Sequence, residues 1–382
     1  MPSKRFGRPQ VFALLLLSAY MLQSFWVIQR TPLRWSEAAY AQAGLDQLAG
    51  KLQPRDRGAL PVPAVIAAAP VIIVHPYPSL LSPNRLKWLL RLPFVAFGWL
   101  LGASIWYVAR RLYGNAGGYI ALALYCFSPA VLFPWPGPLL TGSLGIFGTI
   151  FVAIAAAHTL YAPREATVSE LRSRWRRIVL LALAIALAAG CGFWAILLVA
   201  VGLAFMLYLV PERRMASLTL VLSACVVASL LLLAFFGFRP RAFAEAVLHA
   251  NWLPQRGMVI SEMVRAYLTG ILRPENWLLL LFTAIALVAY LACGRCRYFG
   301  NTAPLLSLLV VTALALVMFA DVFVGPFPFR ATPFLYVFIA GVFADLLETR
   351  WRNPFRLLVL GLLAASAVTS VMAVVRLPAK VL

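Results

Sequence analysis

The sequence predicts an all-α, polytopic membrane protein with about eleven transmembrane helices and a helical first periplasmic loop. Hydrophobic residues make up 63% of its 382 residues and charged residues only 12%, whereas soluble domains average roughly 45–50% and about 25%. Apolar runs near the length of a bilayer-spanning helix, about 20 residues, recur along the chain. This composition excludes a soluble globule, and we expect residues 1–382 to form a single integral-membrane domain.

The first predicted helix follows a basic N-terminal segment. Three basic residues precede an apolar run at residues 11–28, which is the charge order of a secretory signal. Because this run is long enough to span and no cleavage motif follows it closely, we expect an uncleaved helix with the N-terminus in the cytoplasm. The other predicted helices lie near residues 88–108, 117–133, 139–160, 178–190, 193–210, 217–238, 276–293, 303–324, 331–346 and 357–375.

The long apolar run from Ile178 to Val210 determines the predicted topology. It is too long for one span and is interrupted only at Gly190-Cys191-Gly192. A break there puts 17 of the 33 basic residues in cytoplasmic segments and one, Arg330, in the short outer loops, which fits the positive-inside rule. The C-terminus is then periplasmic. Topology thus accounts for just over half of the basic residues behind the net charge of +21, and twelve more lie in two long outer loops. No nucleic-acid partner is expected because such binders carry their basic patch on a polar scaffold.

Two long outer loops, residues 30–87 and 239–275, are the expected places for a functional site. The first opens with an amphipathic segment from Trp35 to Gly50, which predicts a helix lying at the membrane surface with Glu37 in its first turn. A second apolar segment, Pro61 to Val74, contains three prolines and is expected to be interfacial or re-entrant.

Three basic side chains, at the end of the first loop and the start of the second helix, are candidates for binding a lipid phosphate. They are His75, Arg85 and Arg91, the last of which lies slightly inside the apolar boundary of the second helix. Arg91 has an alternative role as a snorkelling residue. Glu37 also has an alternative role, in which its negative charge interacts favourably with the positive N-terminal end of the helix dipole.

Between residues 30 and 160 the order of features resembles a known family. An acidic helix and a His-Pro element are followed by Ala109-Arg110-Arg111-Leu112-Tyr113-Gly114, a Gly-rich turn, the run Tyr119–Leu124 and Phe127-Ser128-Pro129. This order is similar to that of the C-type integral-membrane glycosyltransferases, nearest to the protein O-mannosyltransferase and aminoarabinose transferase branch. The segment Arg330-Ala331-Thr332-Pro333-Phe334 is similar to a late Arg-containing element of that family.

The resemblance implies an enzyme of the bacterial inner membrane that transfers a sugar from a polyprenyl-phosphate donor to a lipid, glycan or protein acceptor at the periplasmic face. It implies no further cofactor and no metal. The family carries an Asp-Glu pair in the first outer loop, and its Asp is regarded as the catalytic carboxylate; the matching dipeptide here is Ser36-Glu37. Because a hydroxyl cannot remove the acceptor proton unaided, Glu37 is the expected catalytic residue.

Four further residues are candidates for the site: Ser36, Asp321, Arg330 and Glu262. Asp321 is the one carboxylate predicted well inside an apolar segment, and its alternative role is an ion pair with Arg330. Glu262 lies in the second long loop. The five cysteines lie within or beside apolar runs without a metal-like or disulfide-like framework, so we expect them to pack.

Two other functions remain open. The loss of the acidic pair suits a non-catalytic relative that serves as a membrane partner or a lipid-phosphate-binding subunit. The glycine break in residues 190–192 suits a lipid or small-molecule transporter.

Overall fold

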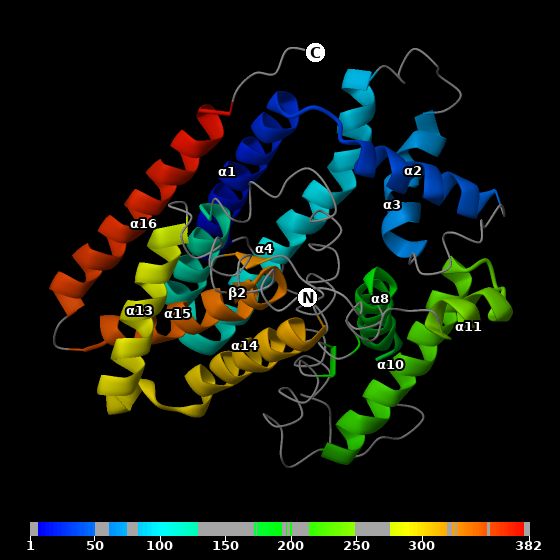
Figure 1. Ribbon diagram of the computed structural model, residues 1–382. Helices are drawn as coiled ribbons and strands as arrows, with labels where there is room; N and C mark the ends of the chain where they lie inside the picture. The colour runs from blue at the N-terminus through cyan, green and yellow to red at the C-terminus, as the bar shows by residue number, and fades with distance from the viewer. Residues whose placement is uncertain are drawn as a thin grey trace. The chain divides into compact units, whose positions relative to one another are not determined.

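The structure, a computed structural model, is almost entirely helical in the residues that it describes (Figure 1). The exceptions are turns, short 3₁₀ segments and the two-residue strands β1 (Phe323–Val324) and β2 (Phe327–Pro328), which pair antiparallel. The all-α prediction is therefore confirmed. The described residues are 7–49, 61–74, 83–128, 172, 174–192, 196, 199–200, 214–248, 276–318, 323–324, 327–349 and 352–377.

Within this part of the chain, five helices are long and apolar enough to cross a membrane. This finding indicates a membrane protein in contact with a lipid bilayer. The predicted number of eleven spans stays a prediction, because residues 139–160 and most of residues 193–210 lie outside the described residues. The five helices are Pro9–Arg30, Asn84–Cys126, Leu218–Phe235, Phe329–Leu347 and Asn353–Val375, and shorter apolar helices are Val62–Val74, Trp277–Ala292 and Phe299–Leu314.

The two helices predicted at residues 88–108 and 117–133 form one element, α4 (Pro83–Cys126), with a break at Gly114. Gly114 has φ 73° and ψ −168°, and glycine adopts positive φ without the steric penalty of a Cβ. The chain is helical on both sides of this residue, so the predicted boundary falls where the backbone changes direction.

The described chain divides into two compact units. Unit 1 comprises Met1–Pro32, Gly102–Trp135 and Gln255–Leu382, and unit 2 comprises Leu33–Leu101 and Pro136–Pro254. The single-domain prediction for residues 1–382 stays a prediction.

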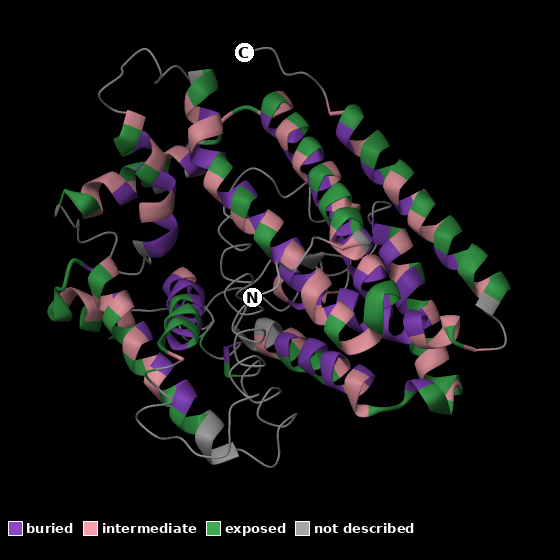
Figure 2. Ribbon diagram, turned by 180° about the vertical axis from the view of Figure 1, so that it is seen from behind, coloured by how far each residue is buried: buried purple, intermediate pink, exposed green. Residues whose placement is uncertain are grey.

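In unit 1, α15 is the most deeply buried helix, and α13, α14 and α16 pack against it. Figure 2 shows the contrast with α16, which exposes much of its apolar surface; Leu357, for example, is 73% exposed. Buried polar contacts join α1, α4 and α16: the Gln23 amide donates to the carbonyl oxygen of Cys126, and the Ser370 hydroxyl donates to the Gln23 Oε1 atom at 2.8 Å. The helices of unit 1 besides α4 are α1 (Arg8–Arg30), α13 (Trp277–Ala292), η5 (Gly294–Cys296), α14 (Phe299–Met318), η6 (Phe329–Ala331), α15 (Thr332–Leu347) and α16 (Arg352–Val375).

In unit 2, α2 packs closely along α3, and α8 packs against α10. Gly44 on α2 lies so near α3 that a Cβ there would overlap the carbonyl group of Ala64 and lie 2.7 Å from the Ala68 Cβ. A hydrophobic cluster at Ala41, Val71 and Leu90 joins α2, α3 and the start of α4. The helices of unit 2 are α2 (Trp35–Leu48), α3 (Pro61–Val74), α8 (Trp175–Cys191), α10 (Arg214–Phe235) and α11 (Pro240–Leu248).

Most predicted helices that lie in the described residues agree with the structure, but the predicted C-terminal end of one helix is wrong. The helix predicted from Trp35 is α2, and the segment with three prolines is helix α3, in which Pro70 lies inside the helix. The position of these helices at the membrane surface stays a prediction. The helix predicted at residues 303–324 was extended too far: α14 ends at Met318, and residues 323–324 form β1. The β-branched and aromatic residues at that end suit a strand as well as a span.

Candidate functional site

The site is built on the first turn of α2. Arg34 is the N-cap residue, with an extended backbone (φ −89°, ψ 149°), and Glu37 is the third helical residue. The Glu37 Oε2 atom accepts a hydrogen bond from the Arg34 backbone N–H at 2.8 Å. This is the reach-back contact of a capping box, and it satisfies an N–H that the helix itself leaves unpaired. The cap also fixes the direction of the Glu37 side chain.

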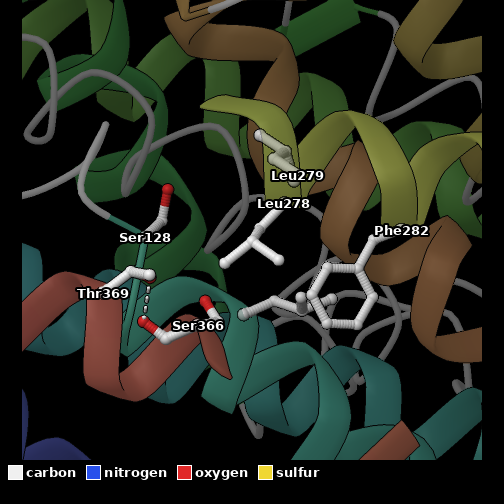
Figure 3. A pocket seen from close by; sticks show the side chains of 7 residues that line it. Ser128, Leu278, Leu279, Phe282, Ser366 and Thr369 are labelled. Atoms are coloured by element: carbon white, nitrogen blue, oxygen red, sulfur yellow. Dashed lines mark hydrogen bonds between the residues drawn. The ribbon is translucent and has the colours of Figure 1, made fainter. Parts of the chain in front are cut away.

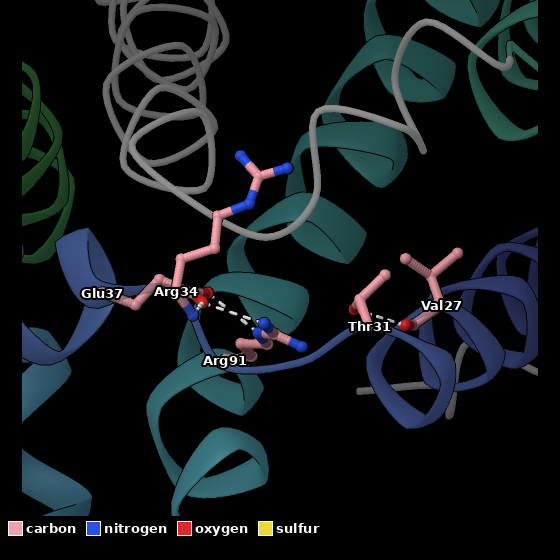
Figure 4. A network of polar contacts seen from close by, with 5 residues as sticks. All are labelled: Val27, Thr31, Arg34, Glu37 and Arg91. Carbon is pink, nitrogen blue, oxygen red and sulfur yellow. Dashed lines mark hydrogen bonds and ion pairs between the residues drawn. The ribbon is translucent and has the colours of Figure 1, made fainter. Parts of the chain in front are cut away.

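Arg91 on α4 holds the same carboxylate from the other side. Its Nε donates to Glu37 Oε1 and its Nη2 donates to Glu37 Oε2, both at 2.8 Å (Figure 4). Two parallel bonds between a guanidinium and a carboxylate are the strongest common form of ion pair in proteins. Arg91 is 1% exposed and Glu37 is 7% exposed. The ion pair is therefore buried, and it fixes α2 against α4.

Further positive charge lies on the first turns of α4. Lys87 precedes Arg91 by four residues, so both belong to one face of the helix. Lys87 is only 9% exposed and experiences the positive charge of Arg91. Arg85 is exposed, and the Arg34 side chain points away from the ion pair (Figure 4). Because Glu37 balances one cation, the start of α4 has a net positive charge that suits an anionic group.

The hydrogen bonds define what Glu37 can do chemically. A carboxylate has about four acceptor positions, and three are filled by the two Arg91 donors and the Arg34 N–H. A general base needs an acceptor position that faces the proton it removes. In this arrangement Glu37 is held in one orientation and has about one acceptor position left for a proton. Further acceptor positions open when Arg91 moves to another anion.

Of the predicted site residues, the structure brings Glu37 and Arg91 together. Arg85 lies six residues before Arg91 on the same helix, whereas Arg330 lies in η6 of unit 1. Ser36 is in the first turn of α2, and its side chain is outside the described part. The remaining candidates, His75, Asp321 and Glu262, lie outside the described residues.

Unit 1 contains a pocket that the sequence did not predict (Figure 3). It is a small pocket among the end of α4, the start of α13 and the middle of α16. Its lining is neutral, and two of its hydroxyls, on Ser366 and Thr369, donate to backbone carbonyls. Without a cation, the pocket offers no counter-charge for a phosphate. Its lining residues are Leu124, Ser128, Leu278, Leu279, Phe282, Ser366 and Thr369.

Neither a family model nor a curated protein matches this chain. Among the described residues, no group of three or more His, Cys, Asp or Glu side chains is arranged to hold a metal ion. The chemical groups of the candidate site are the Glu37–Arg91 ion pair and the basic side chains beside it.

Proposed function

We propose that the chain is a glycosyltransferase that moves a sugar from a polyprenyl-phosphate donor to an acceptor at the periplasmic face of a bacterial inner membrane. Its N-terminus would be cytoplasmic and its C-terminus periplasmic. The observation that best supports this proposal is the buried Glu37–Arg91 pair, in which the expected base contacts an expected phosphate ligand. The positive charge of Lys87 and Arg85 on the same helix adds to it.

In the proposed reaction, the acceptor oxygen forms a bond to the anomeric carbon of the sugar and its proton passes to the Glu37 carboxylate. The bond between the anomeric carbon and the phosphate oxygen breaks, and its electron pair leaves with the polyprenyl phosphate. Negative charge therefore develops on the phosphate in the transition state. Cations that are already positioned stabilise such charge without reorganising, and in this proposal Arg91 and Lys87 on α4 supply them.

The hydrogen bonds of Glu37 give this proposal a specific order of events. Carboxylates and phosphates present similar pairs of oxygens to a guanidinium fork. A donor phosphate that takes over Arg91 would release two of the three bonds on Glu37. Donor binding would thus free further acceptor positions on the base, while the Arg34 N–H still orients it.

The test follows consumption of the donor, because this readout does not depend on knowing the acceptor. Purified chain in liposomes is given polyprenyl-phosphate-linked sugars, and release of polyprenyl phosphate is measured with cell-envelope extract as the acceptor source. Glu37→Gln should lower release by about 10²- to 10⁴-fold, the typical contribution of general acid–base catalysis. Glu245→Gln is the matched control, since Glu245 is an exposed carboxylate on α11 of the same unit. Wild-type rates in the Glu37→Gln variant would refute Glu37 as the base.

The bonding of Glu37 also favours a second candidate, a non-catalytic membrane subunit that binds a lipid phosphate. Both Glu37 oxygens are engaged, as in an ion pair that serves only to hold two helices. Under this alternative no sugar is transferred by the wild-type chain, but polyprenyl phosphate still raises its unfolding temperature. Under the transferase proposal the same membranes show transfer that depends on Glu37.

A further inference from the structure

Two cysteines border the turn between α13 and α14 in unit 1. Cys293 is the C-cap residue of α13, and Cys296 ends the 3₁₀ segment η5 that follows. The backbone N–H of Cys296 donates to the carbonyl oxygen of Cys293 at 3.0 Å. Turns closed by such a bond bring the two end Cα atoms within about 7 Å, and disulfides join Cα atoms roughly 4.4–6.8 Å apart. The backbone of this turn therefore suits a direct bridge.

The side chains are also close. A hydrogen bond with the Cys293 side chain is among the causes that raise the pKa of Cys296, which is consistent with the close backbone positions of the two residues. Among the described cysteines, the other three are on different helices, α4, α8 and α10. The sequence spacing of two intervening residues, Gly294 and Arg295, is thus matched by a hydrogen-bonded turn that brings the two cysteines close together.

The two thiols differ in exposure, which sets the order in which they react. Cys293 is partly exposed, whereas Cys296 is fully buried. Burial, followed by the influence of Cys293 and Asp345, raises the pKa of Cys296 to about 12, against the opposing effect of Arg295. Because the thiolate is the attacking form, Cys296 remains a protonated thiol near neutral pH. An external reagent therefore meets Cys293 first.

We propose that Cys293 and Cys296 form a redox-active dithiol that closes reversibly to a disulfide by exchange with a glutathione-type small-molecule disulfide. The Cys293 thiolate attacks the small disulfide, forms a mixed disulfide and releases one small thiol. Cys296 then gives up its proton and attacks the Cys293 sulfur, forming the Cys293–Cys296 bond and releasing the second small thiol. Each step exchanges one disulfide for another, so no other oxidant is required.

The position of the dithiol gives its oxidation state a structural effect. The Asn301 Nδ2 atom donates both to the Cys296 carbonyl oxygen at 3.0 Å and to Asp345 Oδ2 at 2.6 Å. Asn301 is on α14 and Asp345 is on α15, so the turn carrying the cysteines is bonded to the junction of these helices. In the predicted topology this turn is cytoplasmic, where thiols are kept reduced and disulfides are typically transient or redox-sensing.

The experiment uses the full chain in liposomes, treated with oxidised glutathione, unfolded with acid to stop exchange, alkylated and digested with trypsin. Trypsin cuts after Arg295, between the two cysteines, so the two peptides remain joined only through a disulfide. In a variant with Cys126, Cys191 and Cys225 replaced by alanine, we expect joined peptides that separate on reduction. Cys293→Ser and Cys296→Ala in this background should each abolish the joined product.

The wild-type chain supplies a second measurement that does not depend on the folding of any variant. There, the joined pair should form faster in the native protein than in protein unfolded by detergent, because the turn holds the thiols together. Two outcomes would overturn the proposal. One is stable glutathione on Cys293 without joined peptides; the other is joining that is no faster in the native protein than after unfolding.

Discussion

Replacing Arg91 by methionine removes one partner of the buried ion pair while keeping a long apolar side chain on α4. In the variant, Glu37 would stay buried with the Arg34 N–H as its one remaining donor among the three bonds described. Leaving one member of a buried pair without its partner typically costs about 3–5 kcal/mol of unfolding free energy. Since Arg91 is 1% exposed and Glu37 7% exposed, solvent cannot substitute for the missing guanidinium. We therefore expect a loss in this range.

The assay is equilibrium unfolding in mixed micelles by graded addition of a denaturing detergent, followed by intrinsic fluorescence. Arg85→Met is the matched control; because Arg85 is exposed on the same helix, its loss should change stability by less than about 0.5 kcal/mol. The loss of unfolding free energy in a Glu37→Gln/Arg91→Met double variant should be about 1–3 kcal/mol smaller than the sum of the losses in the two single variants. Additive losses, or equal effects at positions 85 and 91, would refute the reasoning.

Three more predictions use the same unfolding assay. Gly341→Ala on α15 should destabilise by about 1–3 kcal/mol because its Cβ would overlap α14, whereas Gly361→Ala on α16 meets no atom within 4 Å and should stabilise by up to about 1 kcal/mol; equal effects would contradict this. Gly44→Ala should also cost about 1–3 kcal/mol and speed amide exchange along α2, since its Cβ would overlap α3; unchanged exchange would argue against that close packing. Ser370→Ala should cost about 1 kcal/mol by removing a buried hydrogen bond to α1, and no loss would show that the bond contributes nothing net.

The helices were predictable because apolar runs and caps are local signals. The first-turn position of Glu37, the glycine boundary in α4 and the helix at Pro61–Val74 all follow from residues close in sequence. Where local signals compete, prediction failed: the run to residue 324 has the hydropathy of a span, yet residues 323–324 pair as a strand with residues 327–328. Pairing of that kind depends on a turn and not on composition.

The ion pair was not predictable as a contact. Glu37 and Arg91 are 54 residues apart, and each has an adequate separate explanation, a dipole match for one and snorkelling for the other. Only the packing of α2 against α4 shows that they satisfy each other. The cysteine pair differs, since the spacing of Cys293 and Cys296 is visible in the sequence; the sequence did not show the 3₁₀ turn that brings the two residues close together.

The charge balance at the start of α4 connects the sequence with the proposed function. The sequence has Ser36 where the family that it resembles has a second acid, so Glu37 is the one acidic residue in the first turn of α2. One carboxylate matched to one guanidinium is neutral, and Lys87 and Arg85 then give this region a net positive charge. A second acid in this turn would cancel part of that charge. Restoring it with Ser36→Asp should therefore weaken the binding of polyprenyl phosphate, and tighter binding would show that the cations of α4 do not form the phosphate site.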